Sequence, residues 1–121
     1  MNEINPRDMT VLAATIEENR DMSNSVYLGR VLHPYALKMP ADWDGATITF
    51  QTGLDGTTWS DVYLSTGDEY TVSVAAANWV LLDPTCLEGL GPYIKLRSGT
   101  SQSLVTQTAE REVGVYVRQD D

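Results

Sequence analysis

The segment from residue 46 to residue 64 predicts a β-hairpin. Its first half alternates apolar and polar residues, the period-two pattern of a strand with one buried face, and the apolar set is Ala46, Ile48 and Phe50. Asp55-Gly56 follows as a turn, because Gly adopts a positive φ freely and Asp hydrogen-bonds its own backbone. Residues 57–64 are rich in β-branched and aromatic types and return as a second strand. The segment therefore indicates a β-rich domain.

The rest of the chain contains further short strand-like segments separated by turns, at 10–16, 25–32, 35–39, 70–74, 79–82, 93–97, 104–107 and 112–118. Pro34 precedes one of them and cannot donate to a ladder, so we predict a short edge strand at 35–39. Residues 79–82 are apolar on both sides, which is typical of a central strand that is covered on both faces.

Helical signals are confined to two short stretches, after Pro40 in 40–45 and around 85–88. The pattern predicts an all-β fold, a single β-sandwich or jelly roll of roughly eight or nine short strands with at most one or two helical turns. Residues 1–8 are polar and contain Pro6, and they are interpreted as a flexible N-terminal arm. The sandwich domain is then residues 9–121.

Length and charge narrow the classes of function. A chain of 121 residues is long enough for one sandwiched core but not for two. Its net charge of −9 argues against nucleic acid and anionic membranes as partners, and it makes copies of the chain repel one another. The start of the chain has no signal-peptide pattern, and the uncharged run 70–82 is too short to span a bilayer. We expect a protein made in a reducing cytoplasm.

Residues with catalytic or metal-binding chemistry are sparse. His33 is the only histidine and stands before Pro34, without a nucleophile motif, so we expect no enzyme. Most carboxylates fall in turns, where Asp hydrogen-bonds the backbone, although calcium held by loop carboxylates stays an alternative. One Cys and one His cannot build a zinc site, and we predict no metal and no cofactor. Cys86 has no disulfide partner and is interpreted as a small buried hydrophobe.

The strand at 93–97 carries the candidate binding residues. Alternation directs Ile94 and Leu96 inward, which leaves an aromatic and two basic residues outward, namely Tyr93, Lys95 and Arg97. This face suits an acidic partner or a sugar, because Arg binds carboxylates and aromatic rings stack on sugars. Alternatively, its charges pair with Asp or Glu on the neighbouring strand. The tryptophans, Trp43, Trp59 and Trp79, form either a sugar platform or part of the core.

Two segments together resemble the discoidin-like, galactose-binding-like jelly rolls. These are the hairpin Phe-Gln-Thr-Gly-Leu-Asp-Gly-Thr-Thr-Trp and the strand Tyr-Ile-Lys-Leu-Arg-Ser-Gly, residues 50–59 and 93–99. The family usually has Ser where Gly53 stands, and commonly a basic residue where Pro92 stands.

Motifs over 10–118 are similar to those of small virion structural proteins of tailed bacteriophages. They are Ala-Thr-Ile at 14–16, Ser-Asn-Ser-Val-Tyr-Leu-Gly at 23–29, Met-Pro-Ala-Asp-Trp at 39–43, the hairpin, Leu-Leu-Asp-Pro at 81–84, Lys-Leu-Arg-Ser-Gly-Thr at 95–100 and Val-Thr-Gln at 105–107. The resemblance implies a capsid decoration (cement) protein that binds the outside of the head and bridges major capsid subunits. It also implies a homo-oligomer, with a trimer favoured, made in the host bacterial cytoplasm and located on the virion.

Two other functions stay open at this point. The first is a carbohydrate-binding head-fibre or adsorption module, with Trp43, Tyr93 and Arg97 near a host-surface glycan. The second is a head–tail or tail component. The partner- or ligand-binding residues predicted from the sequence are Tyr93, Lys95, Arg97 and Trp43, and no residue is assigned a catalytic role.

Overall fold

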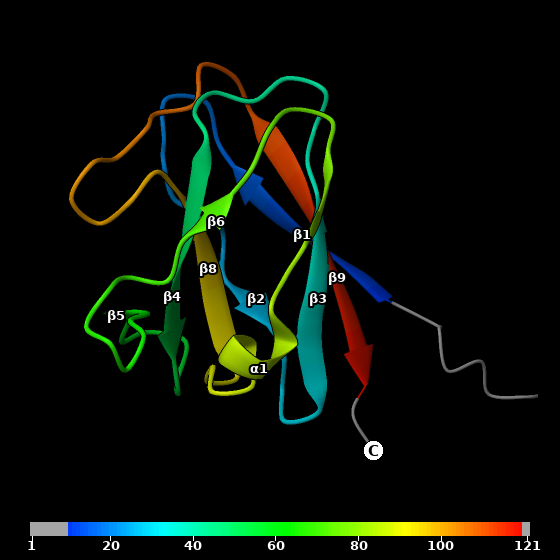
Figure 1. Ribbon diagram of the computed structural model, residues 1–121. Helices are drawn as coiled ribbons and strands as arrows, with labels where there is room; N and C mark the ends of the chain where they lie inside the picture. Colours follow the sequence, from blue (N-terminus) through cyan, green and yellow to red (C-terminus); the bar gives the residue numbers. More distant parts are fainter. Residues whose placement is uncertain (1–9, 120–121) are drawn as a thin grey trace, which may run out of the picture.

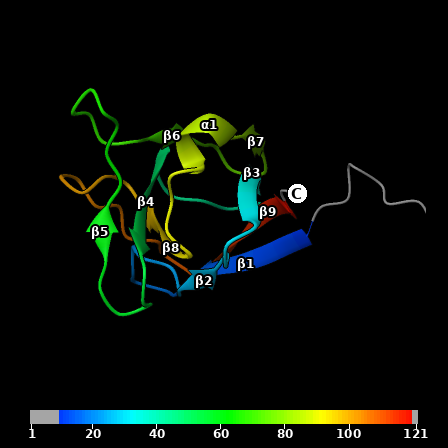
Figure 2. The ribbon, with the colours of Figure 1, turned by 90° about the horizontal axis from the view of Figure 1, so that it is seen from below.

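The predicted hairpin belongs to one of two antiparallel sheets that pack face to face (Figures 1 and 2). The computed structural model describes residues 10–119, and these residues form nine strands and one short helix. Sheet A has the order β1-β9-β3-β7, with bounds Thr10–Ile16, Arg111–Gln119, Leu32–Lys38 and Trp79–Leu81. Sheet B has the order β2-β8-β4-β5, with β6 also paired to β4, and bounds Val26–Tyr27, Tyr93–Ser98, Thr47–Gly53, Ser60–Asp61 and Val72–Ser73. The all-β sandwich predicted from the sequence is confirmed.

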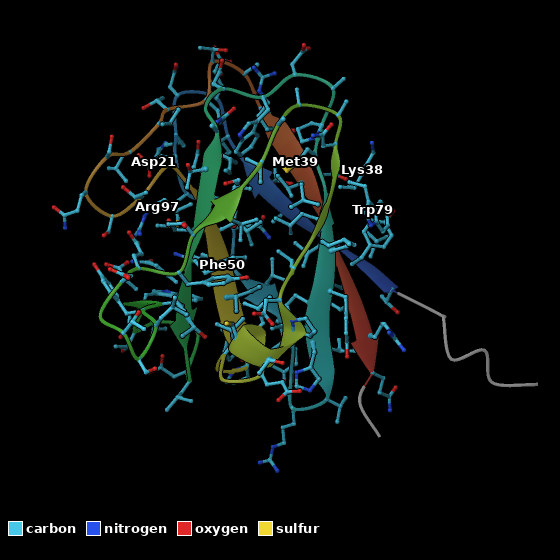
Figure 3. The ribbon with its side chains drawn as sticks, in the orientation of Figure 1. Asp21, Lys38, Met39, Phe50, Trp79 and Arg97 are labelled. Carbon is cyan, nitrogen blue, oxygen red and sulfur yellow. The ribbon has the colours of Figure 1, made fainter. Side chains whose placement is uncertain are left out.

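The core lies between the sheets and consists of the inward members of each alternating strand. Sheet B contributes Ile48, Phe50, Ile94 and Leu96, all 0% exposed. Sheet A contributes Leu37, Val113, Val115 and Val117, also 0% exposed. Burying one such side chain stabilises the fold by roughly 1.5–3 kcal/mol, so this double layer dominates the folding energy. Figure 3 shows Phe50 and Met39 directed into the space between the sheets.

One short helix, α1 at Pro84–Leu87, covers one side of the sandwich between the two sheets (Figure 2). Asp83 caps it by accepting a hydrogen bond from the Thr85 N–H at 3.0 Å, and Pro84 occupies the first turn, where no N–H is needed. Leu87 fills the core beneath it and is 1% exposed. The helical turn predicted near 85–88 is confirmed, whereas the turn predicted at 40–45 is wrong, because that segment forms bends and not a helix.

The predicted places of two strands in the sheet are wrong. Pro34 does not end a strand: it lies within β3 at a bulge between Pro34 and Ala36, where its missing N–H costs no ladder bond. Strand β3 pairs with β9 on one side and β7 on the other, so it is not an edge strand. Strand β7 is the edge instead, and Trp79 and Leu81 are 49% and 79% exposed.

The prediction for Cys86 is also wrong. Its thiol is exposed in α1 and donates a hydrogen bond to the Asp83 carboxylate over 3.3 Å between Sγ and Oδ2. This hydrogen bond to the carboxylate, together with desolvation, raises the pKa of Cys86 above its ordinary value. The thiol is therefore held in its protonated, unreactive form at neutral pH.

The predicted arm, residues 1–8, lies outside the described residues. Within residues 10–119, no helix has the length and apolar character needed to cross a membrane.

Candidate functional site

The predicted binding residues Tyr93 and Lys95 lie on the outer face of sheet B. Tyr93 pairs with Tyr27 of β2, and the two rings are 4.9 Å apart between centroids. The Lys95 ammonium lies 4.6 Å from the centroid of the Trp59 ring, a cation–π contact. We call Tyr27, Trp59, Tyr93 and Lys95 the aromatic strip. Tyr27 is its most open member, with 61% of its surface exposed.

The loop between β4 and β5 positions the aromatic strip. Gly53 ends β4 so close to this loop that a Cβ there would run into the Thr58 carbonyl oxygen, which explains why Ser is absent from this position. Gly56 has φ +77° and lies against the Tyr93 ring, so its turn requires Gly both for conformation and for space. Asp55 accepts the N–H groups of Thr57 and Thr58 at 2.9 and 2.8 Å and holds the loop in shape.

We predict that Asp55→Asn lowers the stability of the fold at neutral pH and makes that stability less dependent on pH. The two threonine N–H groups lower the pKa of Asp55 below 3.8, so its charged form contributes stability above that value, and the contribution is lost as the pH falls through the folded-state pKa. The measurement is the urea midpoint of wild type and Asp55→Asn at pH 7 and at pH 2.5. The wild type should have the higher urea midpoint at pH 7, and the difference between the two midpoints should be smaller at pH 2.5.

The matched control for this variant is Asp68→Asn, an exposed turn position on the next loop. Both variants replace one Asp with Asn, so at pH 7 they change the formal net charge equally. If the Asp55→Asn difference stayed constant between the two pH values, or if Asp68→Asn behaved identically, the assigned role of the Asp55 carboxylate would be contradicted.

Arg97 lies on the same strand but is not open to a partner. Its side chain is 6% exposed, and its NH2 and NH1 groups donate to Asp61 at 2.6 Å and to Glu69 at 3.3 Å. Glu69 in turn accepts the N–H and hydroxyl of Ser101, both at 3.1 Å. The Arg97 Nε is buried and has no hydrogen-bond partner within residues 10–119. The sequence left open whether Arg97 binds a partner or pairs with carboxylates of its own chain. In the structure it pairs with carboxylates of its own chain.

Trp43 is not brought together with Tyr93. It lies just before the start of β4, whereas Tyr93 pairs with Gly53 at the end of β4. A strand rises about 3.4 Å per residue, so the two positions are separated by roughly 20 Å along the sheet. Trp43 packs against the core, and its buried Nε1 has no hydrogen-bond partner in the described part of the chain. Tyr93 and Lys95 lie together in the aromatic strip, and Trp43 lies apart from them. A binding role for these three residues stays a prediction.

A buried polar clip, unforeseen from the sequence, ties two loops together beside Trp43. The Gln107 side chain is 0% exposed and holds Asp44 from both sides: its Oε1 accepts the Asp44 N–H at 3.0 Å and its Nε2 donates to the Asp44 carbonyl at 2.8 Å. Nε2 also donates to the Ser98 Oγ at 2.7 Å. The Asp44 carboxylate accepts from the Thr108 N–H at 2.8 Å, and this bond is the main cause that lowers the pKa of Asp44.

The outer face of sheet A is a second exposed surface, which we call the apolar face. Two rows of residues cross its four strands in register. One row runs Val11, Tyr116, Ala36, Leu81, and the other runs Ala13, Gly114, Lys38, Trp79. The rings of Trp79 and Tyr116 are in contact, with centroids 4.6 Å apart, and Ala36, on the strand between theirs, is only 1% exposed at an outward position. Figure 3 shows Trp79 and Lys38 directed away from the core.

Sequence reasoning missed the apolar face because it took a two-sided apolar strand as evidence of a central place in the sheet. Strand β1, at Thr10–Ile16, also has apolar residues on both faces, whereas the outward residues of β9, at Arg111–Gln119, are mixed. Strands with apolar residues on both faces are expected when a further layer covers the outer side of the sheet. Within residues 10–119 no such layer lies over this face, since both sheets are already accounted for.

Two further observations complete the site. A hollow of about 580 Å³ lies between the β4–β5 hairpin and residues 89–91, near the exposed Leu54. Among the described residues, no group of three or more His, Cys, Asp or Glu side chains is placed to hold a metal ion.

The sequence matches no protein family model, and comparisons with curated proteins and with solved structures return no match either.

Proposed function

We propose that this protein is a capsid decoration (cement) protein of a tailed bacteriophage. It is made in the host bacterial cytoplasm, binds the outside of the head and stabilises the shell by bridging major capsid subunits. The proposal is supported by the motif resemblance that extends over residues 10–118. It is also supported by the fold, since a small β-sandwich offers rigid outer faces on which contacts can be built.

The observation that carries the proposal is the presence of two separate contact surfaces on opposite sides of one domain. The apolar face exposes Trp79 and Leu81 on sheet A, and the aromatic strip exposes Tyr27 on sheet B. A protein that bridges two neighbours needs at least two such surfaces, and aromatic side chains are enriched at the energetic centres of interfaces. Elsewhere the chain is strongly acidic, with a net charge of −9, which keeps nonspecific contacts few.

We predict about one copy of this protein per major capsid subunit in purified particles of the phage that encodes it. Shell-wide symmetry offers that many equivalent positions, whereas a vertex, connector or tail offers only a few. Quantitative mass spectrometry of purified particles measures the ratio directly. A few copies per hundred capsid subunits would favour the head–tail or tail alternative, and complete absence from particles would overturn the proposal.

A carbohydrate-binding head-fibre or adsorption module is the second candidate, and the aromatic strip favours it. Aromatic rings bind the apolar faces of sugars, and the hollow of about 580 Å³ beside the hairpin provides a recess at the same end of the sandwich. Saturable binding to a glycan array, combined with a low copy number in particles, would favour this candidate over the decoration proposal.

A further inference from the structure

We propose that the apolar face of sheet A is a self-association surface and that its occupant is the same face of a second copy of this chain. The inference goes beyond the proposed function and does not rest on it, because it concerns the purified protein in solution. It identifies the surface through which two copies associate. It also favours a two-fold symmetric dimer over the trimer that the resemblance implies. Three features of the face support it.

The first feature is the charge of the face. Its two rows contain a single charged residue, Lys38, whose ammonium donates a hydrogen bond to the Ala77 carbonyl at 2.7 Å. The chain as a whole carries −9, so most surfaces of two copies repel each other. The apolar face is a region where two copies approach without placing carboxylate rows opposite one another.

The second feature is the self-complementary charge pattern of β9. Its outward residues are Glu112, Gly114, Tyr116 and Arg118, so an acid and a base lie at equal distances on either side of the midpoint between Gly114 and Tyr116. A two-fold axis through that midpoint and across the strands would put Glu112 of each copy opposite Arg118 of the other. An isologous pair requires this kind of self-complementarity.

The third feature is the shape and size of the face. Gly114 lacks a side chain, and a Cβ there would meet the Tyr116 ring at 3.3 Å, so the ring lies down along the sheet and keeps the face flat. Flat sheet faces pack against one another at about 10 Å. Three of its side chains are strongly exposed, Val11 at 52%, Trp79 at 49% and Leu81 at 79%, and the largest apolar patches on single domains are typically about 300–600 Å². Two faces would together bury about 1,000 Å², near the lower limit of specific interfaces, so we expect a weak dimer in the micromolar range.

Sedimentation equilibrium of the full chain tests the proposal. We expect a monomer–dimer equilibrium that tightens by about threefold or more between 0.05 and 1 M NaCl, because salt screens the repulsion between two acidic copies. Leu81→Asp, at a position 79% exposed, should weaken the dimer at least about tenfold, because it places a carboxylate in the apolar contact. Leu54→Asp is the matched control, because Leu54 is 82% exposed on the loop between β4 and β5 and lies outside the apolar face. This variant should keep the dimer dissociation constant within about twofold of the wild-type value.

A pair of charge reversals tests the orientation. Glu112→Lys would place Lys opposite Arg118 of the other copy and should weaken the dimer about threefold or more. Glu110→Lys makes the same change of net charge from an exposed position just before β9, and it should leave the dimer unchanged or tighten it, because it lowers the overall repulsion.

Four results would overturn the inference. They are a monomer at every concentration and salt tested, a trimer mass, an equal effect of Leu81→Asp and Leu54→Asp, and a full-length monomer that dimerises only after residues 1–9 are removed. The last result would mean that the chain covers its own face. None of these measurements uses phage particles, so the proposed function and the self-association fail or succeed separately.

Discussion

An Arg97→Ala variant is expected to unfold at a lower urea concentration than the wild type, with a loss of about 3 kcal/mol in the free energy of unfolding. The change removes the only cation that pairs, among the described residues, with the carboxylates of Asp61 and Glu69. The Glu69 side chain is 10% exposed and would keep a buried charge without its partner. Asp61 is more exposed, at 32%, so water compensates part of the loss there, and the expected value is at the lower end for buried pairs.

Two comparisons separate this effect from a general change of charge. Arg20→Ala removes the same charge from an exposed position and should cost less than about 0.5 kcal/mol. The double variant Arg97→Ala with Glu69→Gln should lose at least about 1 kcal/mol less than the sum of the two single variants, because the neutral amide no longer needs a cation. Strict additivity in this cycle would contradict the assigned pairing.

A Gln107→Ala variant is expected to lose a similar amount, about 3 kcal/mol, measured again by urea unfolding. The truncation leaves a cavity at a fully buried position and frees the Asp44 N–H and carbonyl, which are held at 3.0 and 2.8 Å by the amide. It also removes the acceptor of the Arg111 Nε at 3.3 Å. The loss should appear as local opening of residues 40–46 in amide hydrogen exchange.

Gln107→Met separates the two causes of that loss. Methionine keeps most of the volume but makes no comparable hydrogen bonds, so the variant should still lose about 2 kcal/mol. Gln102→Ala is the control for glutamine truncation, because Gln102 is exposed in the loop that precedes β9 in the chain. This variant should be close to neutral in stability. A Gln107→Met variant as stable as the wild type would show that packing, and not the polar clip, determines the contribution of this residue.

The parts of the fold that depend on local pattern were predictable from the sequence. Alternation placed Ile94 and Leu96 in the core, and the Asp55-Gly56 turn joined two paired strands. A helical turn was also expected near 85–88, and the structure shows that Asp83 caps this helix and that Pro84 lies in its first turn. Each of these features is determined by residues within a few positions of one another.

The parts that depend on distant partners were not predictable. Whether a strand is central or at an edge is decided by which strands pair with it, and β7 pairs with β3, some forty residues earlier in the chain. The carboxylates that neutralise Arg97 come from Asp61 and Glu69, far from it in sequence. The amide of Gln107 likewise reaches back to Asp44. Local alternation shows that a side chain points outward, but it does not show what covers it there.

The pairing of β1 with β9 has a mechanical consequence. The two strands are antiparallel neighbours, with Thr10 opposite Val117 and Ile16 opposite Arg111, so the first and last described residues leave the sheet at the same end. A tensile force applied between them would break the hydrogen bonds between β1 and β9 one after another. It would not load all of these bonds in shear at the same time. A fold built in this way resists tension poorly when the force is applied through Thr10 and Gln119. An anchoring tether is therefore best placed away from these two residues.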